Sequence, residues 1–178
     1  MSQTSLVLNL GSGRDWREDC LNADIERRVK SDWCLDIQDV HWGSLLVTRL
    51  GDFYVKRGMF DKIIANDVLE HVPDSSSVVR ACAQLVKPGG WVFFSTLNRN
   101  LKSFMLAIVG AEYVLNMLPK GTHEYAKFIR PSELASHCRH AGLDVLHSRG
   151  MSYNPITRRY WLNDDTSVNY LIATRRPL

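Results

Sequence analysis

The chain has 178 residues, a formal net charge of +3 at pH 7 and a hydrophobic fraction of 45%. This length fits one domain spanning residues 1–178, and the ordinary composition excludes disordered and fibrous proteins. The charge is mild and no long basic run occurs, so we expect no nucleic-acid partner.

Short apolar runs and helical patterns alternate through the first third of the chain, as in βαβ units with a parallel sheet. Residues 5–10 (SLVLNL) predict a buried strand that runs into a glycine turn. Residues 20–24 and 33–37 predict two further short strands, each with an acid at its end. Residues 42–55 carry apolar side chains at helical spacing and predict a helix.

The rest of the chain continues this alternation. Three features punctuate it: the Lys87-Pro-Gly-Gly90 turn, the apolar run WVFFST at 91–96, and Pro131 at the start of a helical pattern that ends before Gly142. The predicted strands are 60–66, 91–96, 143–148 and 167–174, and the predicted helices are 75–86, 101–118 and 131–141.

These elements predict an α/β fold with a Rossmann-like, doubly wound and mostly parallel sheet. The last two strands are expected at the sheet edge and are candidates for antiparallel pairing. Only six residues separate Gly13 from Cys20, whereas a normal crossover with its helix needs about 10–12. The first crossover helix is therefore expected to be absent or reduced to a single turn.

The first strand ends in Asn9-Leu-Gly-Ser-Gly13, where the backbone can turn sharply and approach a ligand. Asp24 can accept hydrogen bonds from ribose hydroxyls, and Asp36 can accept a hydrogen bond from the adenine amino group. The two acids can exchange these roles, and both can instead cap turns. The phosphate-binding glycine pattern is incomplete, which argues against NAD and fits a cofactor without phosphates.

Four cysteines occur without a C-x-x-C pair, which favours buried thiols in a reduced, cytoplasmic protein. The first residues lack the features of a signal peptide. The apolar stretch 104–118 is interrupted by Gly110, Glu112 and Asn116 and is too short to span a bilayer.

From Phe60 onward the sequence resembles the ubiquinone-biosynthesis O-methyltransferase family, a class I group that uses S-adenosyl-L-methionine. The runs that carry the resemblance are DVLEHVPD at 67–74, VVRACAQLVKPGGWVFFSTLNRN at 78–100 and VGAEYVLNMLPKGTHEYAKFIRPSEL at 109–134. The pieces YNPIT at 153–157 and VNY at 168–170 are also similar to the end of the family's chains. The first third departs from the family, because its motif I and long N-terminal helical extension are not matched.

The resemblance implies methyl transfer to a polyprenylated catechol or phenol in ubiquinone biosynthesis. It also implies that Asp67, Glu70 and His71 hold Mg²⁺ or another divalent cation. On a helical turn these three side chains would share a face. The residues expected to contact the cofactor are Asn9, Gly11, Ser12, Gly13, Asp24, Asp36, Ile37, Asn66, Asp67 and Val68.

Catalytic alternatives stay open at this point. His71, Glu70 and His123 are candidates for the group that takes the acceptor's proton, while Glu70 and His71 can also be mere helix caps. The insert at about 99–130 is a candidate lid over the acceptor pocket. It is also a candidate peripheral contact with the inner face of an anionic membrane, since Arg99, Lys102 and Lys120 flank it.

Two other functions compete with this hypothesis. One is methyl transfer to another small-molecule, glycan or lipid acceptor. The other is a binding module that retains the fold without catalysis. Nothing in the sequence indicates an oligomeric state.

Overall fold

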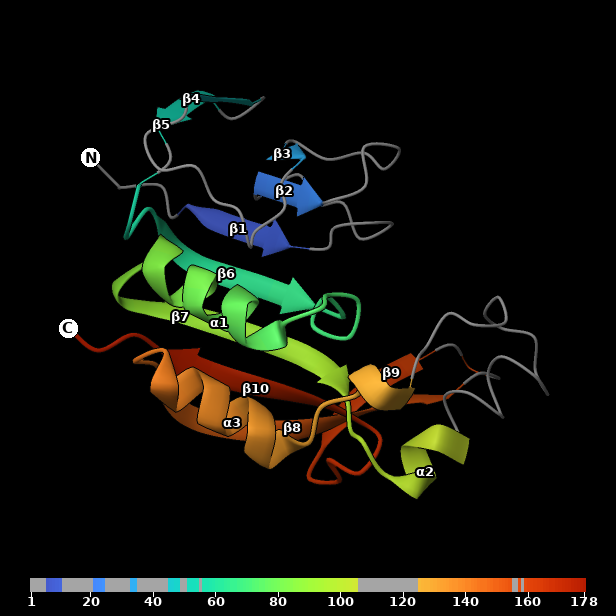
Figure 1. The fold of residues 1–178 in the computed structure, drawn as a ribbon. Helices are drawn as coiled ribbons and strands as arrows, with labels where there is room; N and C mark the ends of the chain where they lie inside the picture. Colours follow the sequence, from blue (N-terminus) through green and yellow to red (C-terminus); the bar gives the residue numbers. More distant parts are fainter. Residues whose placement is uncertain are drawn as a thin grey trace.

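The computed structural model describes residues 6–10, 21–24, 33–34, 45–48, 51–54, 56–105, 125–154, 157 and 159–178, with only the backbone path given between 21 and 54. An eight-stranded sheet has the order β3-β2-β1-β6-β7-β10-β8-β9 (Figure 1). In that order its strands are Trp33–Cys34, Leu21–Asp24, Val7–Leu10, Phe60–Asn66, Val86–Leu97, Asn169–Arg175, Asp144–Asn154 and Arg159–Asn163.

The sheet is parallel at its centre. β1 pairs in parallel with β2 and β6, and β6 pairs in parallel with β7. β10 is antiparallel to both β7 and β8, so the antiparallel pairing offered for the late strands is confirmed. Their predicted position at the sheet edge is wrong, because β10 lies between β7 and β8, and β8 is itself covered by β9. The chain runs outward from β1 in both directions, so the topological switch point lies between β1 and β6. The predicted α/β doubly wound fold is confirmed.

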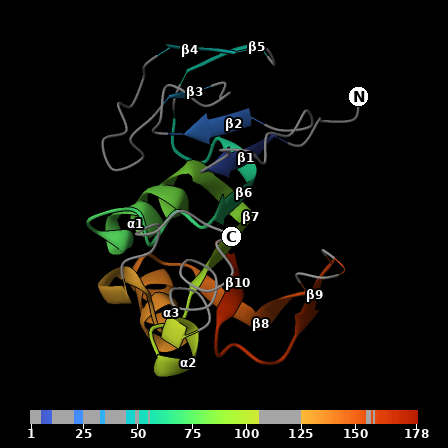
Figure 2. The same cartoon turned by 90° about the vertical axis from the view of Figure 1, so that its right-hand side faces the viewer.

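Two helices, α1 (Ser75–Leu85) and α3 (Pro131–His140), lie side by side on one face of the sheet (Figure 2). The Asp74 carboxylate caps α1, because its Oδ1 accepts a hydrogen bond from the Ser76 backbone N–H at 2.9 Å. Both helices bury an apolar stripe that includes Cys82 and Cys138. Burial raises the pKa of the Cys138 thiol to about 12, as expected for inert core thiols.

The helix predicted over residues 42–55 is wrong. The chain forms two antiparallel strands there, β4 (Leu45–Thr48) and β5 (Gly51–Tyr54). Gly51 would cost about 1 kcal/mol in the middle of a helix, and the β-branched and aromatic residues around it favour strands. Apolar spacing alone did not distinguish the two structures.

The long helix predicted over 101–118 is described only at its start, where α2 covers Leu101–Ser103. A 3-10 helix, η3 (Tyr125–Lys127), precedes α3, and residues 106–124 lie outside the described chain. The shortened first crossover at residues 14–19 also lies outside it. None of the described helices is long and apolar enough to span a membrane.

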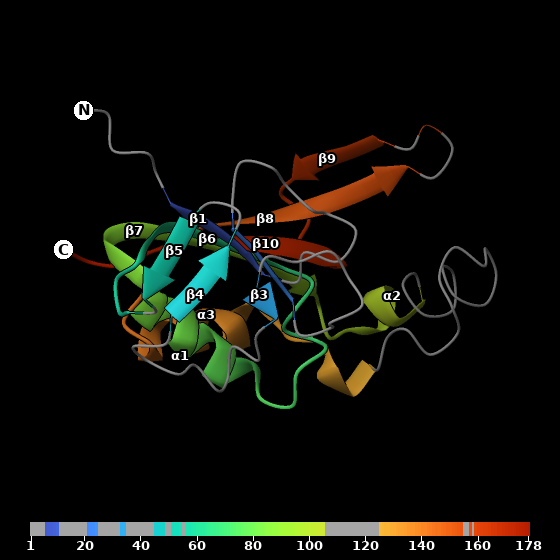
Figure 3. The same ribbon diagram turned by 90° about the horizontal axis from the view of Figure 1, so that it is seen from above.

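The last part of the sheet is larger than the sequence predicts. β8 extends to Asn154 rather than Ser148, and β9 returns antiparallel to it. Figure 3 shows β8 and β9 as a ribbon that extends away from the neighbouring strands. No sequence pattern had indicated β9.

Candidate functional site

The carboxyl ends of β1, β2 and β6 meet at the switch point of the sheet. Leu10, the last residue of β1, pairs with Ala23 on one side and with Ala65 on the other. Asp24 and Asn66 therefore each lie one residue beyond the end of β1, on its two flanks. Open α/β sheets bind ligands in this position, outside the carboxyl ends of their strands.

Asp67 turns the chain sharply after β6. Its φ of 48° is left-handed, a conformation that aspartate tolerates better than most residues. Ser95 of β7 holds this turn: the Asp67 N–H donates to the Ser95 Oγ at 3.1 Å, and the Ser95 hydroxyl lies 3.1 Å from Asp67 Oδ1. The Asp67 carboxylate is thereby fixed at the end of the sheet.

Glu70 is a buried carboxyl three residues farther on, with 4% of its surface exposed. The Thr96 hydroxyl donates a 2.8 Å hydrogen bond to Glu70 Oε2. Burial, with the negative charge of Asp67 as a smaller cause, raises the pKa of Glu70 to about 7, although the bonds from Thr96 and the backbone oppose this shift. Glu70 therefore titrates near neutral pH.

The two carboxyls are held by consecutive residues of one strand, Ser95 and Thr96 of β7. Because successive side chains of a strand point to opposite faces, the partners of Asp67 and Glu70 lie on opposite sides of the sheet. The helical turn predicted for Asp67-x-x-Glu70-His71 is wrong, since Asp67 is left-handed and the His71 N–H bonds to the Val68 carbonyl at 3.1 Å.

The positions of Asp67, Glu70 and His71 decide whether these residues can bind one metal ion together. Among the described side chains, no three His, Cys, Asp or Glu are grouped so that they could hold a metal ion. Glu70 faces Thr96 in the interior, whereas His71 is exposed. As they stand, Asp67, Glu70 and His71 do not fit a shared divalent cation.

Tyr170 of β10 lies near Glu70 on the helix-covered face. It is completely buried, and its hydroxyl donates to the Ile129 carbonyl at 2.9 Å. Burial first, and then the charge of Glu70, raise the pKa of Tyr170. The Ile129 N–H donates to the Leu97 carbonyl at 3.0 Å. This bond holds the two ends of segment 98–128 together at the end of β7.

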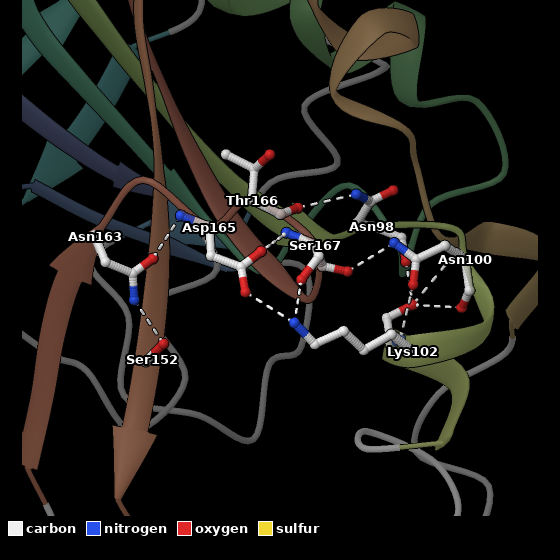
Figure 4. Close-up of polar contacts among 9 residues, drawn as sticks. Asn98, Asn100, Lys102, Ser152, Asn163, Asp165, Thr166 and Ser167 are labelled. Atoms are coloured by element: carbon white, nitrogen blue, oxygen red, sulfur yellow. Dashed lines mark hydrogen bonds and ion pairs between the residues drawn. The ribbon is translucent and has the colours of Figure 1, made fainter.

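The start of that segment is tied to the turn before β10 (Figure 4). Lys102 Nζ lies 2.8 Å from Asp165 Oδ2 and 2.6 Å from the Ser167 hydroxyl. The side-chain amides of Asn98 and Asn100 donate to the carbonyls of Thr166 and Ser167. These contacts fix the direction in which the insert leaves the sheet.

The other predicted site residues are located as follows. Asn9 is 1% exposed and pairs across the sheet with Ile64, so its side chain lies on the same face as Asn66 and Ser95. Asn66 and Val68 are half-buried. The side chain of Asp24 lies outside the described residues, as do Gly11, Ser12, Gly13, Asp36, Ile37 and His123.

Sequence reasoning missed Ser95, Thr96 and Tyr170. The first two follow the apolar run 91–94 and lie just before Leu97, the last residue of β7. Two hydroxyls near the carboxyl end of a buried strand are a usable signal. No local pattern brings Tyr170 to Glu70, because that proximity depends on the pairing of β10 with β7, which sets Tyr170 opposite Thr96.

A family model described as a methyltransferase domain matches residues 10–148. Among curated proteins, the chain is 74% identical over 119 residues to the ubiquinone biosynthesis O-methyltransferase of Albidiferax ferrireducens, covering 67% of this chain and 47% of that protein. It is 69% identical over 119 residues to the enzyme of the same name from Chromobacterium violaceum, covering 67% and 51%. The chain thus spans about half the length of the curated relatives it matches.

Solved structures share the fold. A SAM-dependent methyltransferase from Methanosarcina mazei superposes with a TM-score of 0.65 at 13% identity, covering 100% of this chain and 95% of that one. An S-adenosylmethionine-dependent methyltransferase from Mesorhizobium loti gives a TM-score of 0.61 at 18% identity, covering 97% and 91%. At these identities the likeness establishes the class I methyltransferase fold alone.

Proposed function

The chain belongs to the methyltransferase-domain family, and on that premise we propose that it is an S-adenosylmethionine-dependent O-methyltransferase acting on a polyprenylated catechol or phenol, as in ubiquinone biosynthesis. The observation that carries this proposal is the polar group at the switch point. Asn9 and Asn66 lie on one face of the sheet, and Asp67 is fixed beside them by Ser95. Amide and carboxylate groups suit the hydroxyl and amino groups of a nucleoside without phosphates.

In this reaction the methyl group moves from a sulfonium to the acceptor oxygen. The bond from sulfur to methyl breaks as the bond from oxygen to methyl forms, and the phenolic proton must leave. A phenol resembles tyrosine, whose unperturbed pKa is about 10, so the chain has to supply a proton acceptor at neutral pH. Positioning the acceptor in line is the other contribution of the chain.

His71 is the group we propose as the proton acceptor, because it is exposed just beyond the Asp67 turn. Glu70 is too buried to touch an acceptor, and we propose it as a positioning residue that holds the turn against Thr96. His123 stays a prediction. The geometry of Asp67, Glu70 and His71 does not fit a shared divalent cation.

Calorimetry with S-adenosylmethionine tests the cofactor site, and turnover of a short-chain catechol tests the acceptor chemistry. Asp67→Asn keeps the shape of the side chain and its tolerance for left-handed φ but removes the charge. We expect it to weaken cofactor binding about 10- to 100-fold, because a hydrogen bond to a charged group contributes about 1.5–3 kcal/mol. We expect His71→Ala to lower kcat about 100-fold without changing that affinity.

Asp144→Asn serves as the matched control, since Asp144 is an exposed carboxylate at the start of β8. Absence of cofactor binding in the unsubstituted chain would favour a fold without catalysis. Binding without catechol turnover would favour another small-molecule, glycan or lipid acceptor.

We further propose that the insert contacts a membrane surface peripherally. Leu101 and Met105 are 73% and 50% exposed, and these apolar side chains suit a membrane interface. The neighbouring Lys102 ammonium already pairs with Asp165 within the chain, so the apolar side chains carry this contact. Replacing both apolar residues with serine is expected to abolish co-sedimentation with phosphatidylglycerol vesicles. A chain that never sediments with such vesicles would contradict this contact.

A further inference from the structure

The ribbon of β8 and β9 presents an exposed apolar face. Cross-strand pairs join Tyr153 to Tyr160 and Met151 to Leu162, so these four side chains share one face of the ribbon. The two tyrosine rings lie 4.5 Å apart, centroid to centroid. Tyr160 and Leu162 are nevertheless 66% and 62% exposed. Apolar ladders of this kind are normally covered in soluble proteins.

β9 is also the last strand of the sheet. Among the described strands it pairs with β8 alone, so its outer edge carries backbone N–H and C=O groups with no strand beside them. Natural edge strands are usually protected by proline or by charges in mid-strand. The centre of β9 is instead Tyr160-Trp161-Leu162, with Trp161 49% exposed. Such an edge accepts another β-strand more readily than a helix or loop, because only a strand matches its row of donors and acceptors.

The sequence of β9 is suited to pair with itself. In an antiparallel arrangement centred on Trp161, Tyr160 of one copy faces Leu162 of the other, and Arg159 faces Asn163. Asp164 and Asp165 follow Asn163, so the basic start of each strand lies at the acidic end of the other. Within one chain Asp164 pairs with Arg149 and Asp165 with Lys102, and the Asp164 side chain stays 89% exposed to a second copy. Pairing about a two-fold axis repeats each of these contacts.

We propose that β9 forms an antiparallel interface with β9 of a second copy of this chain, joining the two sheets edge to edge. The four apolar side chains of each ribbon then lie next to those of the other copy. The acid that follows β9 is already held in place, because the Arg149 guanidinium pairs with the Asp164 carboxylate. This interface is independent of the proposed methyl transfer.

Sedimentation velocity of the whole chain over a range of concentrations, without cofactor or acceptor, tests the proposal. The mass is expected to rise from that of one chain to that of two. Tyr160→Lys and Leu162→Lys are each expected to weaken association about tenfold or more, because a two-fold interface contains each substitution twice. Both positions are exposed, so neither variant should unfold the chain.

Leu146→Lys is the matched control, since Leu146 is a 43% exposed leucine of β8 that precedes the segment paired with β9. Slower amide exchange of residues 159–163 in the dimer would support the strand pairing. Three results would overturn the proposal: a single-chain mass at every concentration, a dimer insensitive to both lysines, or a monomer whose ribbon binds lipid vesicles instead.

Discussion

Replacing Glu70 with glutamine is expected to raise the free energy of unfolding by about 3 kcal/mol at pH 8, and by only about 1 kcal/mol at pH 5. The pKa of Glu70 is raised from 4.5 to about 7 by burial and by Asp67. Between these two values the folded chain binds a proton that the unfolded chain has released. The stability of the unsubstituted chain therefore falls as the pH rises through this range, whereas glutamine has no proton to lose.

Urea unfolding at pH 5, 6, 7 and 8 measures this difference, and Asp144→Asn provides the control at an exposed carboxylate. A glutamine variant whose advantage is the same at every pH would show that the ionised Glu70 is not the cause. The same variant separates stability from chemistry. As a positioning residue, Glu70 is expected to affect kcat more than cofactor affinity, even while the fold gains stability.

Replacing Gly150 with alanine is expected to destabilise the chain by about 3 kcal/mol or more. A Cβ atom at Gly150 would lie 1.9 Å from the carbonyl oxygen of Asp165 and 2.5 Å from its carbonyl carbon. Both are backbone atoms, so neither can rotate away as a side chain can. The turn before β10 would have to lift off β8, which would also strain the contact between Asp165 and Lys102 (Figure 4).

Gly142→Ala is the informative control for this substitution. Gly142 has a φ of +80°, and nothing lies within 4 Å of a Cβ built there, so alanine meets only the left-handed backbone penalty of about 1 kcal/mol. Thermal unfolding of the two variants compares a steric clash with a conformational cost. Equal losses in the two variants would show that the turn over Gly150 can move freely.

Local sequence signals predict the central part of this fold well. Residues 60–66, 75–86 and 131–141 carry unambiguous periodicity and end signals, and the structure has β6, α1 and α3 there. Residues 42–55 carry apolar side chains that fit a helix and a hairpin equally, and tertiary context selected the hairpin. β9 was missed because exposed apolar residues on both faces give no alternating pattern.

The sequence alone also brought Asn66 and Asp67 to the ligand edge of the sheet, because the end of a buried parallel strand determines where the following residues lie. Only the tertiary structure decided toward which side of the sheet the Asp67 and Glu70 carboxyls point. Their spacing suggested that both acids share one face of a helical turn. Because Asp67 is left-handed and because of the register between β6 and β7, Asp67 instead bonds to Ser95 and Glu70 bonds to Thr96. Register depends on contacts between distant segments, and a shift of one residue exchanges the two faces of a strand.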